Sequence, residues 1–122
     1  MTCAIAVDTC TTPIININRK RGDTRAMVFV IQIDSVNIDI SLWTNFLLTV
    51  TTDKAPTDDT TKVEQLTGTF VTDGTDSKIA FIPDGLLDVG TYYYDVQAID
   101  PAGGKLTLVE GKYKLAQDRT KD

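Results

Sequence analysis

The stretch that decides the fold is LDVGTYYYDV, residues 87–96, in which three consecutive tyrosines follow an aspartate and a glycine. Consecutive residues of a β-strand point to opposite faces of a sheet, so Tyr92 and Tyr94 share one face and Tyr93 lies on the other. A platform that stacks sugars or bases needs its rings on one exposed face, and this run does not supply that. We therefore interpret the tyrosine run as structural.

The residues Asp88, Gly90, Tyr92 and Tyr94 follow the pattern D-x-G-x-Y-x-Y, which is typical of a tyrosine corner. In an immunoglobulin-like sandwich, a tyrosine near the start of the sixth strand packs on the core, and its hydroxyl binds backbone a few residues upstream. Tyr92 is predicted to take that role, and Tyr94 to fill the space that a disulfide occupies in antibody domains. Both rings are expected to point inward, whereas Tyr93 is expected to be exposed or to lie in an interface.

Other parts of the chain also alternate apolar and polar residues with a period of two. The clearest is TRAMVFVIQI, residues 24–33, where one face is predicted to hold Met27, Phe29, Ile31 and Ile33 while Val28 and Val30 fall on the other, as expected of a central strand covered on both sides. Further runs lie at 13–19, 46–53, 62–71, 78–83 and 105–115, and turn residues separate them. The pattern predicts an all-β fold, an Ig-like antiparallel β-sandwich of about seven strands.

A chain of 122 residues suits one domain. Residues 1–12 are predicted to form an N-terminal arm or an edge segment, residues 13–116 the Ig-like β-sandwich, and residues 117–122 a charged C-terminal tail. Gly111 is expected to mark a bulge or bend in the last strand. The lone Trp43 is predicted to plug the core rather than to bind a ligand.

The charge balance and the N-terminus exclude several classes of function. The formal net charge of -5 argues against nucleic acid or anionic lipid as a partner of the whole surface. The first residues have no basic start, and their apolar run is too short for a secretion signal or a membrane span. We therefore predict neither a nucleic-acid partner nor a membrane partner.

Metal and cofactor sites are not predicted. Cys3 and Cys10 are close enough to close only a small loop, and reduced cysteines are favoured because disulfide-stapled domains usually carry several dispersed pairs. With no histidine and two cysteines, a structural zinc site lacks its four ligands. Three acidic pairs lack the spacing of a known calcium loop: Asp34 with Asp39, Asp58 with Asp59, and Asp73 with Asp76.

No catalytic constellation is present either, because the chain has no histidine to act as a base and its glycines do not form a phosphate-binding loop. The chain is predicted not to be an enzyme. Arg21, Gly22 and Asp23 spell an adhesion tripeptide, but a glycine between charged residues also suits a hairpin turn. The basic residues Arg19, Lys20, Arg21 and Arg25 either dock an acidic partner or form a solvated turn, and both readings stay open.

Three motifs in this order resemble one known family. They are RGDT at 21–24, GTYYYDV at 90–96 and TLVEGKY at 107–113. Together they resemble the N-terminal domain of tailed-phage baseplate upper proteins, over residues 13–116. The sequence departs from that family at IDISLWTN, residues 38–45, and it ends at Asp122, where family members typically continue into a helical stalk and a distal domain.

The resemblance implies a bacteriophage virion structural protein without enzymatic activity. It would be an adaptor in the tail, baseplate or neck that attaches to neighbouring virion proteins and forms a homo-oligomer in the particle. Tyr93 and the four basic residues are the expected interface. Two alternatives remain: a capsid decoration protein, and a carbohydrate-binding adhesion module that would need exposed aromatic rings, for which Tyr93, Trp43 and Phe81 are the candidates.

Overall fold

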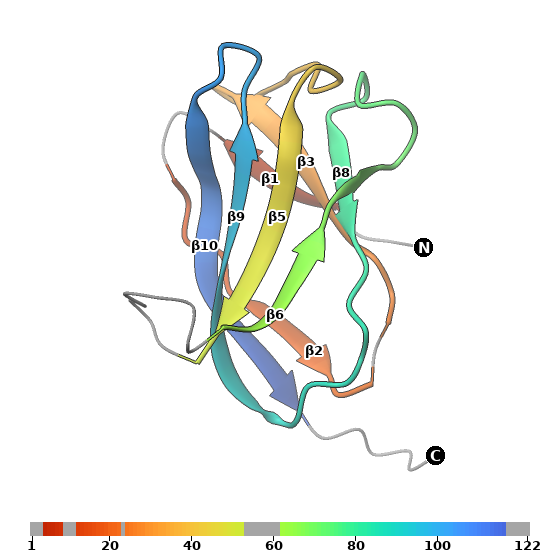
Figure 1. Ribbon diagram of the computed structural model, residues 1–122, viewed down its shortest axis with the longest axis vertical. Helices are drawn as coiled ribbons and strands as arrows, with labels where there is room; N and C mark the ends of the chain where they lie inside the picture. Colours follow the sequence, from red (N-terminus) through yellow and green to blue (C-terminus); the bar gives the residue numbers. More distant parts are fainter. Residues whose placement is uncertain (1–3, 9–11, 23, 53–61, 117–122) are drawn as a thin grey trace.

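The computed structural model describes residues 4–8, 12–22, 24–52 and 62–116, and within these ranges the chain forms strands and no helix (Figure 1). No helix in this described part is therefore long and apolar enough to span a membrane. The strands are β1 (Ala4–Asp8), β2 (Ile17–Lys20), β3 (Met27–Ile33), β4 (Val36–Asn37), β5 (Thr44–Thr51), β6 (Lys62–Thr67), β7 (Thr69–Phe70), β8 (Lys78–Phe81), β9 (Gly90–Ile99) and β10 (Lys105–Ala116).

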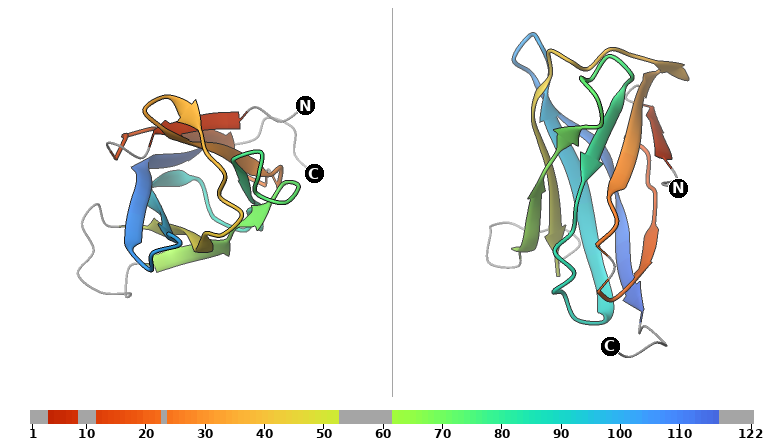
Figure 2. Two further views of the ribbon diagram at one scale, coloured as in Figure 1. Left: turned by 90° about the horizontal axis from the view of Figure 1, so that it is seen from above. Right: turned by 90° about the vertical axis from the view of Figure 1, so that its right-hand side faces the viewer.

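These strands form two sheets that pack face to face, as the view from above shows (Figure 2). The first sheet has the order β1-β3-β8-β7, with the short β4 paired to β3, and the second has the order β2-β10-β9-β5-β6. The predicted all-β sandwich is confirmed. The strand count exceeds the predicted seven because β1 and the two-residue strands β4 and β7 carry too few residues to show a clear alternation.

The sheets are mixed rather than purely antiparallel, because two edge strands run parallel to their neighbours. β1 pairs with β3 in the first sheet, and β2 pairs with β10 in the second. The N-terminal segment thus crosses from the edge of one sheet to the edge of the other. The predicted arm over residues 1–12 contains β1, whose Val7 is fully buried in the core. Cys3, Cys10, Asp23, Asp58, Asp59 and the predicted tail 117–122 lie outside the described residues.

The core sits between the two sheets and uses the faces that alternation predicts. Met27, Phe29 and Ile31 on β3 are buried, and Phe29 meets Phe81 edge to face with ring centroids 5.8 Å apart. Ile33, predicted on the same face, is instead 45% exposed because it is the last residue of the strand. On β5, the alternate residues Phe46, Leu48 and Val50 close the core from the opposite sheet. Burying aromatic and branched side chains of this size contributes roughly 1.5–3 kcal/mol each.

Trp43 closes one end of this core, as predicted. Its indole is half-buried and stacks on Phe46 with the centroids 6.3 Å apart and the planes 17° from parallel. Phe70 meets the same Phe46 ring edge to face. The indole therefore contacts core aromatic rings rather than presenting an open binding face.

Gly111 does not mark the bulge of β10. The register between β10 and β9 shifts between Thr107 and Val109, whereas Gly111 pairs in register with Tyr94. The reason for glycine is a close approach of backbone: an added Cβ would lie 2.8 Å from the carbonyl carbon of Ile15 and closer still to its oxygen. The predicted bulge at Gly111 is therefore wrong, and the glycine makes room for the chain that precedes β2.

Candidate interaction surface

The tyrosine-corner residues adopt the geometry that the spacing suggested. The Tyr92 hydroxyl donates a hydrogen bond to the backbone oxygen of Asp88 at 2.9 Å, and its half-buried ring packs on the edge of the core. Gly90 lies beneath that ring, 3.7 Å from it when a Cβ is added, so the contact is an ordinary one. Tyr92 thereby ties the start of β9 to the loop that leads into it.

Replacing Tyr92 with phenylalanine should lower the free energy of unfolding by about 1 kcal/mol, because it removes one hydrogen bond and keeps the ring. Urea denaturation followed by tryptophan fluorescence measures the change. Tyr93→Phe is the matched control and should alter stability by less than about 0.5 kcal/mol, as is usual for a surface substitution. Equal losses in the two variants would contradict a stabilising corner at Tyr92.

Tyr94 makes a second and deeper hydrogen bond, which the sequence did not predict. Its side chain is 3% exposed, and its hydroxyl donates to the backbone oxygen of Ile15 at 2.6 Å. The ring meets Tyr113 edge to face at 6.4 Å. Burial raises the pKa of Tyr94 well above its usual range, so the hydroxyl remains protonated. Tyr94 thus joins β9 to the segment before β2, which packs closely against Gly111.

The four predicted basic residues lie around the turn between β2 and β3, and several of them make contacts within the domain. The Arg19 guanidinium donates to the backbone oxygen of Arg25 at 2.6 Å. Arg21 lies 3.7 Å from the carboxylate of Asp88, and both side chains are largely exposed. An exposed pair of this kind contributes little to stability. The basic turn is therefore partly structural.

The segment 82–89 lies beside this turn and exposes apolar side chains. Gly85, at φ +75, packs against Gly22 and Thr24 of the turn. Ile82 is 61% exposed, Leu86 78% and Val89 46%. We call the set Lys20, Arg21, Ile82, Leu86 and Val89 the end surface. Arg21 lies at the end of the sandwich where β10 finishes, because its amide donates to the backbone oxygen of Ala116 at 2.8 Å. The segment that follows β8 runs toward the same end (Figure 1).

A buried carboxyl group lies close to the end surface. Glu64 on β6 points inward and is 9% exposed, and the backbone amide of Asp84 donates to its Oε2 at 3.4 Å. Tyr113, Leu115 and Pro83 line the same small space. Burial, together with the nearby carboxyl of Asp84, raises the pKa of Glu64 to about 7. Glu64 is therefore mainly neutral in the folded chain below that pH.

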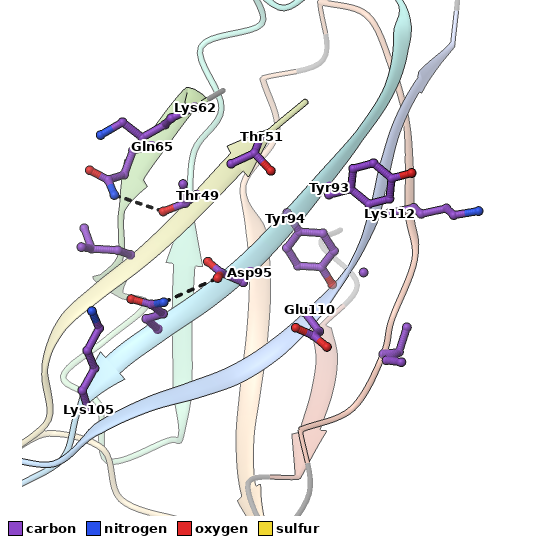
Figure 3. Close-up of a pocket in the computed structure, with 14 residues that line it drawn as sticks. Thr49, Thr51, Lys62, Gln65, Tyr93, Tyr94, Asp95, Lys105, Glu110 and Lys112 are labelled. Carbon is purple, nitrogen blue, oxygen red and sulfur yellow. Dashed lines mark hydrogen bonds between the residues drawn. The ribbon is translucent and has the colours of Figure 1, made fainter. Parts of the chain in front are cut away.

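The outer face of the second sheet holds a hollow of about 500 Å³ (Figure 3). The outward side chains of β6, β5, β9 and β10 line it in rows across the strands. One row contains Thr51, Tyr93 and Lys112, and the next contains Thr49, Asp95 and Glu110. Tyr93 therefore belongs to this hollow, whereas none of the four predicted basic residues lines it.

The electrostatics of the hollow centre on Asp95. Its partial burial raises the pKa of the carboxyl, and the facing Glu110 raises it further, while Gln97 opposes the shift. The Gln97 amide approaches the Asp95 carboxylate at 3.5 Å, the upper limit for such a bond. The Gln65 amide donates to the Thr49 hydroxyl at 3.0 Å. A polar network thus covers the floor, and its central acid has only a weak partner in it.

The exposed aromatic cluster considered from the sequence does not form. Phe81 is fully buried because it points inward from β8, and Trp43 stacks on Phe46. Neither lines the hollow, so Tyr93 is the member of the three that faces it. The acidic loop residues have local roles: Asp39 and Asp73 accept bonds from the backbone amides of Ser41 and Thr75. Hydrogen bonds from the side chains of Ser41 and Thr75, together with these backbone bonds, lower the pKa of both aspartates. The described part contains no group of three or more potential metal ligands.

Comparisons with known proteins give a fold but no family. No family model matches the sequence, and no curated protein is significantly similar to it. Among solved structures, the chain is similar to the N-terminal domain of phage TP901-1 ORF48, with a TM-score of 0.58 at 12% sequence identity. The match covers 92% of this chain and 95% of that one. At such low identity the similarity establishes a common fold and nothing more.

Proposed function

We propose that this chain is a non-enzymatic structural component of a tailed-phage particle, an adaptor that attaches to neighbouring virion proteins in the tail, baseplate or neck. One observation carries the proposal: the fold matches the N-terminal domain of a phage protein over nearly the whole length of both chains, 92% and 95%. The RGDT and GTYYYDV motifs support the same origin.

The chemistry of the domain fits a building block. The chain has no histidine to serve as a general base near neutral pH. Two buried ionisable side chains, Tyr94 and Glu64, both bond to backbone and hold segments of the sandwich together. Small proteins present in many copies gain affinity from repeated contacts, so such a role requires no deep site.

The end surface is the proposed contact with the neighbouring protein. Leu86, Ile82 and Val89 are large apolar side chains exposed on one short segment, and Lys20 and Arg21 lie beside them. An apolar centre with a charged rim is the usual composition of a protein interface. We infer that this end docks on an acidic or mixed surface of the particle, and that a homo-oligomer forms around it.

Purified particles of the phage or prophage that encodes this chain test the proposal. Quantitative mass spectrometry should detect the chain in stoichiometric amounts, and immunogold labelling should place it on the tail. Complementation with Leu86→Asp should lower the incorporated copies at least about tenfold, since a charge would enter an apolar contact.

Val36→Asp is the matched control, because Val36 is also an exposed apolar residue but lies in the β3–β4 hairpin at the opposite end of the sandwich (Figure 1). It should be incorporated within about twofold of the wild type, as expected for a surface substitution outside a contact. Absence of the wild-type chain from purified particles would refute the proposal, and labelling on the head would favour a capsid decoration protein.

A further inference from the structure

We propose that the hollow on the outer face of the second sheet binds a saccharide, with the ring of Tyr93 and the carboxylate of Asp95 as its main contacts. This inference goes beyond a structural role in a particle and does not depend on it. It uses a different surface from the end surface, since Lys20, Arg21, Ile82, Leu86 and Val89 do not line the hollow.

The hollow is built on the rigid part of the fold. Its lining residues lie mainly on four neighbouring strands whose backbone ladders fix their positions, and the register sets Asp95 between Thr49 and Glu110. Tyr93 and Gln97 stand before and after Asp95 on the same face of β9. Sites carried on strands hold their geometry better than sites carried on loops.

The pairing of Asp95 with Glu110 does not stabilise the fold. Like charges directly opposite each other on an antiparallel pair destabilise a sheet. Asp95 is also partly buried, which adds a desolvation cost, and the Gln97 amide that donates to its carboxylate lies 3.5 Å away. Departures from local rules of this kind are expected at functional sites. Two acceptors aimed into one hollow suit a ligand that brings several hydrogen-bond donors.

Tyr93 adds the feature that separates a saccharide from other ligands rich in donors. Its half-buried ring lies beside Lys112 across the strand pair and borders the hollow (Figure 3). A pyranose has an apolar face that packs on such a ring and hydroxyl edges that bond to carboxylates, amides and ammonium groups. Carboxylates, amides and ammonium groups all line the hollow, close to the cross-strand row that contains Tyr93.

The size and charge of the hollow argue against other occupants. A volume of about 500 Å³ falls in the range of small-molecule sites. Lys62, Lys105 and Lys112 nearly balance Asp95 and Glu110, three positive against two negative charges, so the site favours neither nucleic acid nor a strongly charged peptide. An apolar ligand would need a lining with fewer polar side chains.

A titration followed by two-dimensional NMR of the labelled 122-residue chain tests the site. The probes are glucose, galactose, N-acetylglucosamine, rhamnose and glucuronic acid, each up to about 50 mM, which covers the weak affinities typical of small open sites. At least one probe should shift the amide signals of residues 93–97 and 110–112 in a saturable way, and leave those of β8 unchanged.

Variants then connect the shifts to the proposed contacts. Tyr93→Ala should weaken the binding of that probe at least tenfold, whereas Tyr93→Phe, which keeps the ring, should change it less than threefold. Asp95→Asn should weaken it about fivefold, in line with the loss of a charged acceptor. Lys78→Ala, an exposed lysine on the other sheet, is the control and should have no effect.

Three results would overturn the proposal: no saturable shift with any probe, shifts that persist in Tyr93→Ala, or shifts confined to another face. If the signals of residues 93–97 instead move with protein concentration in the absence of sugar, the hollow is a contact between copies of the chain. Each of these outcomes leaves the particle proposal standing, because that proposal is tested on virions and at the end surface.

Discussion

Replacing Gly111 with alanine should lower the free energy of unfolding by about 3 kcal/mol or more, the largest effect of any single methyl group added to this chain. The new Cβ would lie 2.8 Å from the carbonyl carbon of Ile15 and closer still to its oxygen. Backbone rather than a flexible side chain opposes it, so the segment before β2 must move. Urea denaturation measures the change.

The loss should exceed that expected from a clash alone, because the displaced carbonyl is the acceptor of the Tyr94 hydroxyl. Moving it would leave a buried hydroxyl unsatisfied, at a cost of about 1–3 kcal/mol. Tyr94→Phe should therefore be destabilising by itself, and the double variant should lose less than the sum of the two single losses. Strict additivity would show that glycine and tyrosine do not act on the same carbonyl.

Gly90→Ala is the matched control for Gly111→Ala. Gly90 also lies in a strand of the second sheet, but an added Cβ there meets nothing nearer than the Tyr92 ring at 3.7 Å. The free energy of unfolding of the Gly90→Ala variant should differ from that of the wild type by less than about 0.5 kcal/mol. A loss at Gly90 equal to that at Gly111 would mean that alanine is poorly tolerated in these strands for a general reason, and the close approach of Ile15 would not explain it.

Glu64→Gln should abolish a loss of stability that the wild-type chain shows as the pH rises from about 5 to 8. The pKa of Glu64 is raised in the folded state to about 7 from an ordinary value of 4.5, and burial is the main cause. A carboxyl with a raised pKa stabilises the fold fully below its unfolded pKa, and this contribution falls as the pH climbs through the folded value.

The size of this effect should be on the order of 2 kcal/mol between pH 5 and pH 8. Thermal or urea unfolding across that range measures it, and the glutamine variant should have the flatter profile and the higher stability at pH 8. Asp34→Asn, at an exposed carboxyl in the β3–β4 turn, is the control and should retain the wild-type slope. A glutamine variant with the wild-type slope would show that Glu64 is not the titrating group.

The strands that bury one face could be predicted from the sequence. Residues 24–33 alternate so regularly that the sequence predicts the inward set of β3 correctly up to Ile31, because a period of two leaves one arrangement that buries the apolar side chains. The tyrosine corner could be predicted for a similar reason. Its hydrogen bond spans four residues, from Tyr92 back to Asp88, so the spacing itself carries the information.

Features that depend on contacts between distant segments could not be predicted from the sequence. β1 and β2 are short edge strands, and nothing in their residues shows that each would lie parallel to its partner in a different sheet. Gly111 indicated an exceptional backbone position, but a bulge and a close approach both call for glycine. The hollow was missed because Thr49, Asp95 and Glu110 each resemble ordinary solvent-facing residues until the register aligns them.

The parallel alignment of β2 with β10 has a mechanical consequence. The start of the segment that leads into β2 and the end of β10 lie at opposite ends of the paired region, from Pro13 beside Glu110 to Lys20 beside Ala116. Tension applied between those two points would load the bonds of this pair together in shear, instead of peeling them apart one at a time. Forced unfolding is governed by the height of the barrier to rupture. A domain held between two attachments at these points would therefore resist extension along that line far better than it resists tension applied across the sheet.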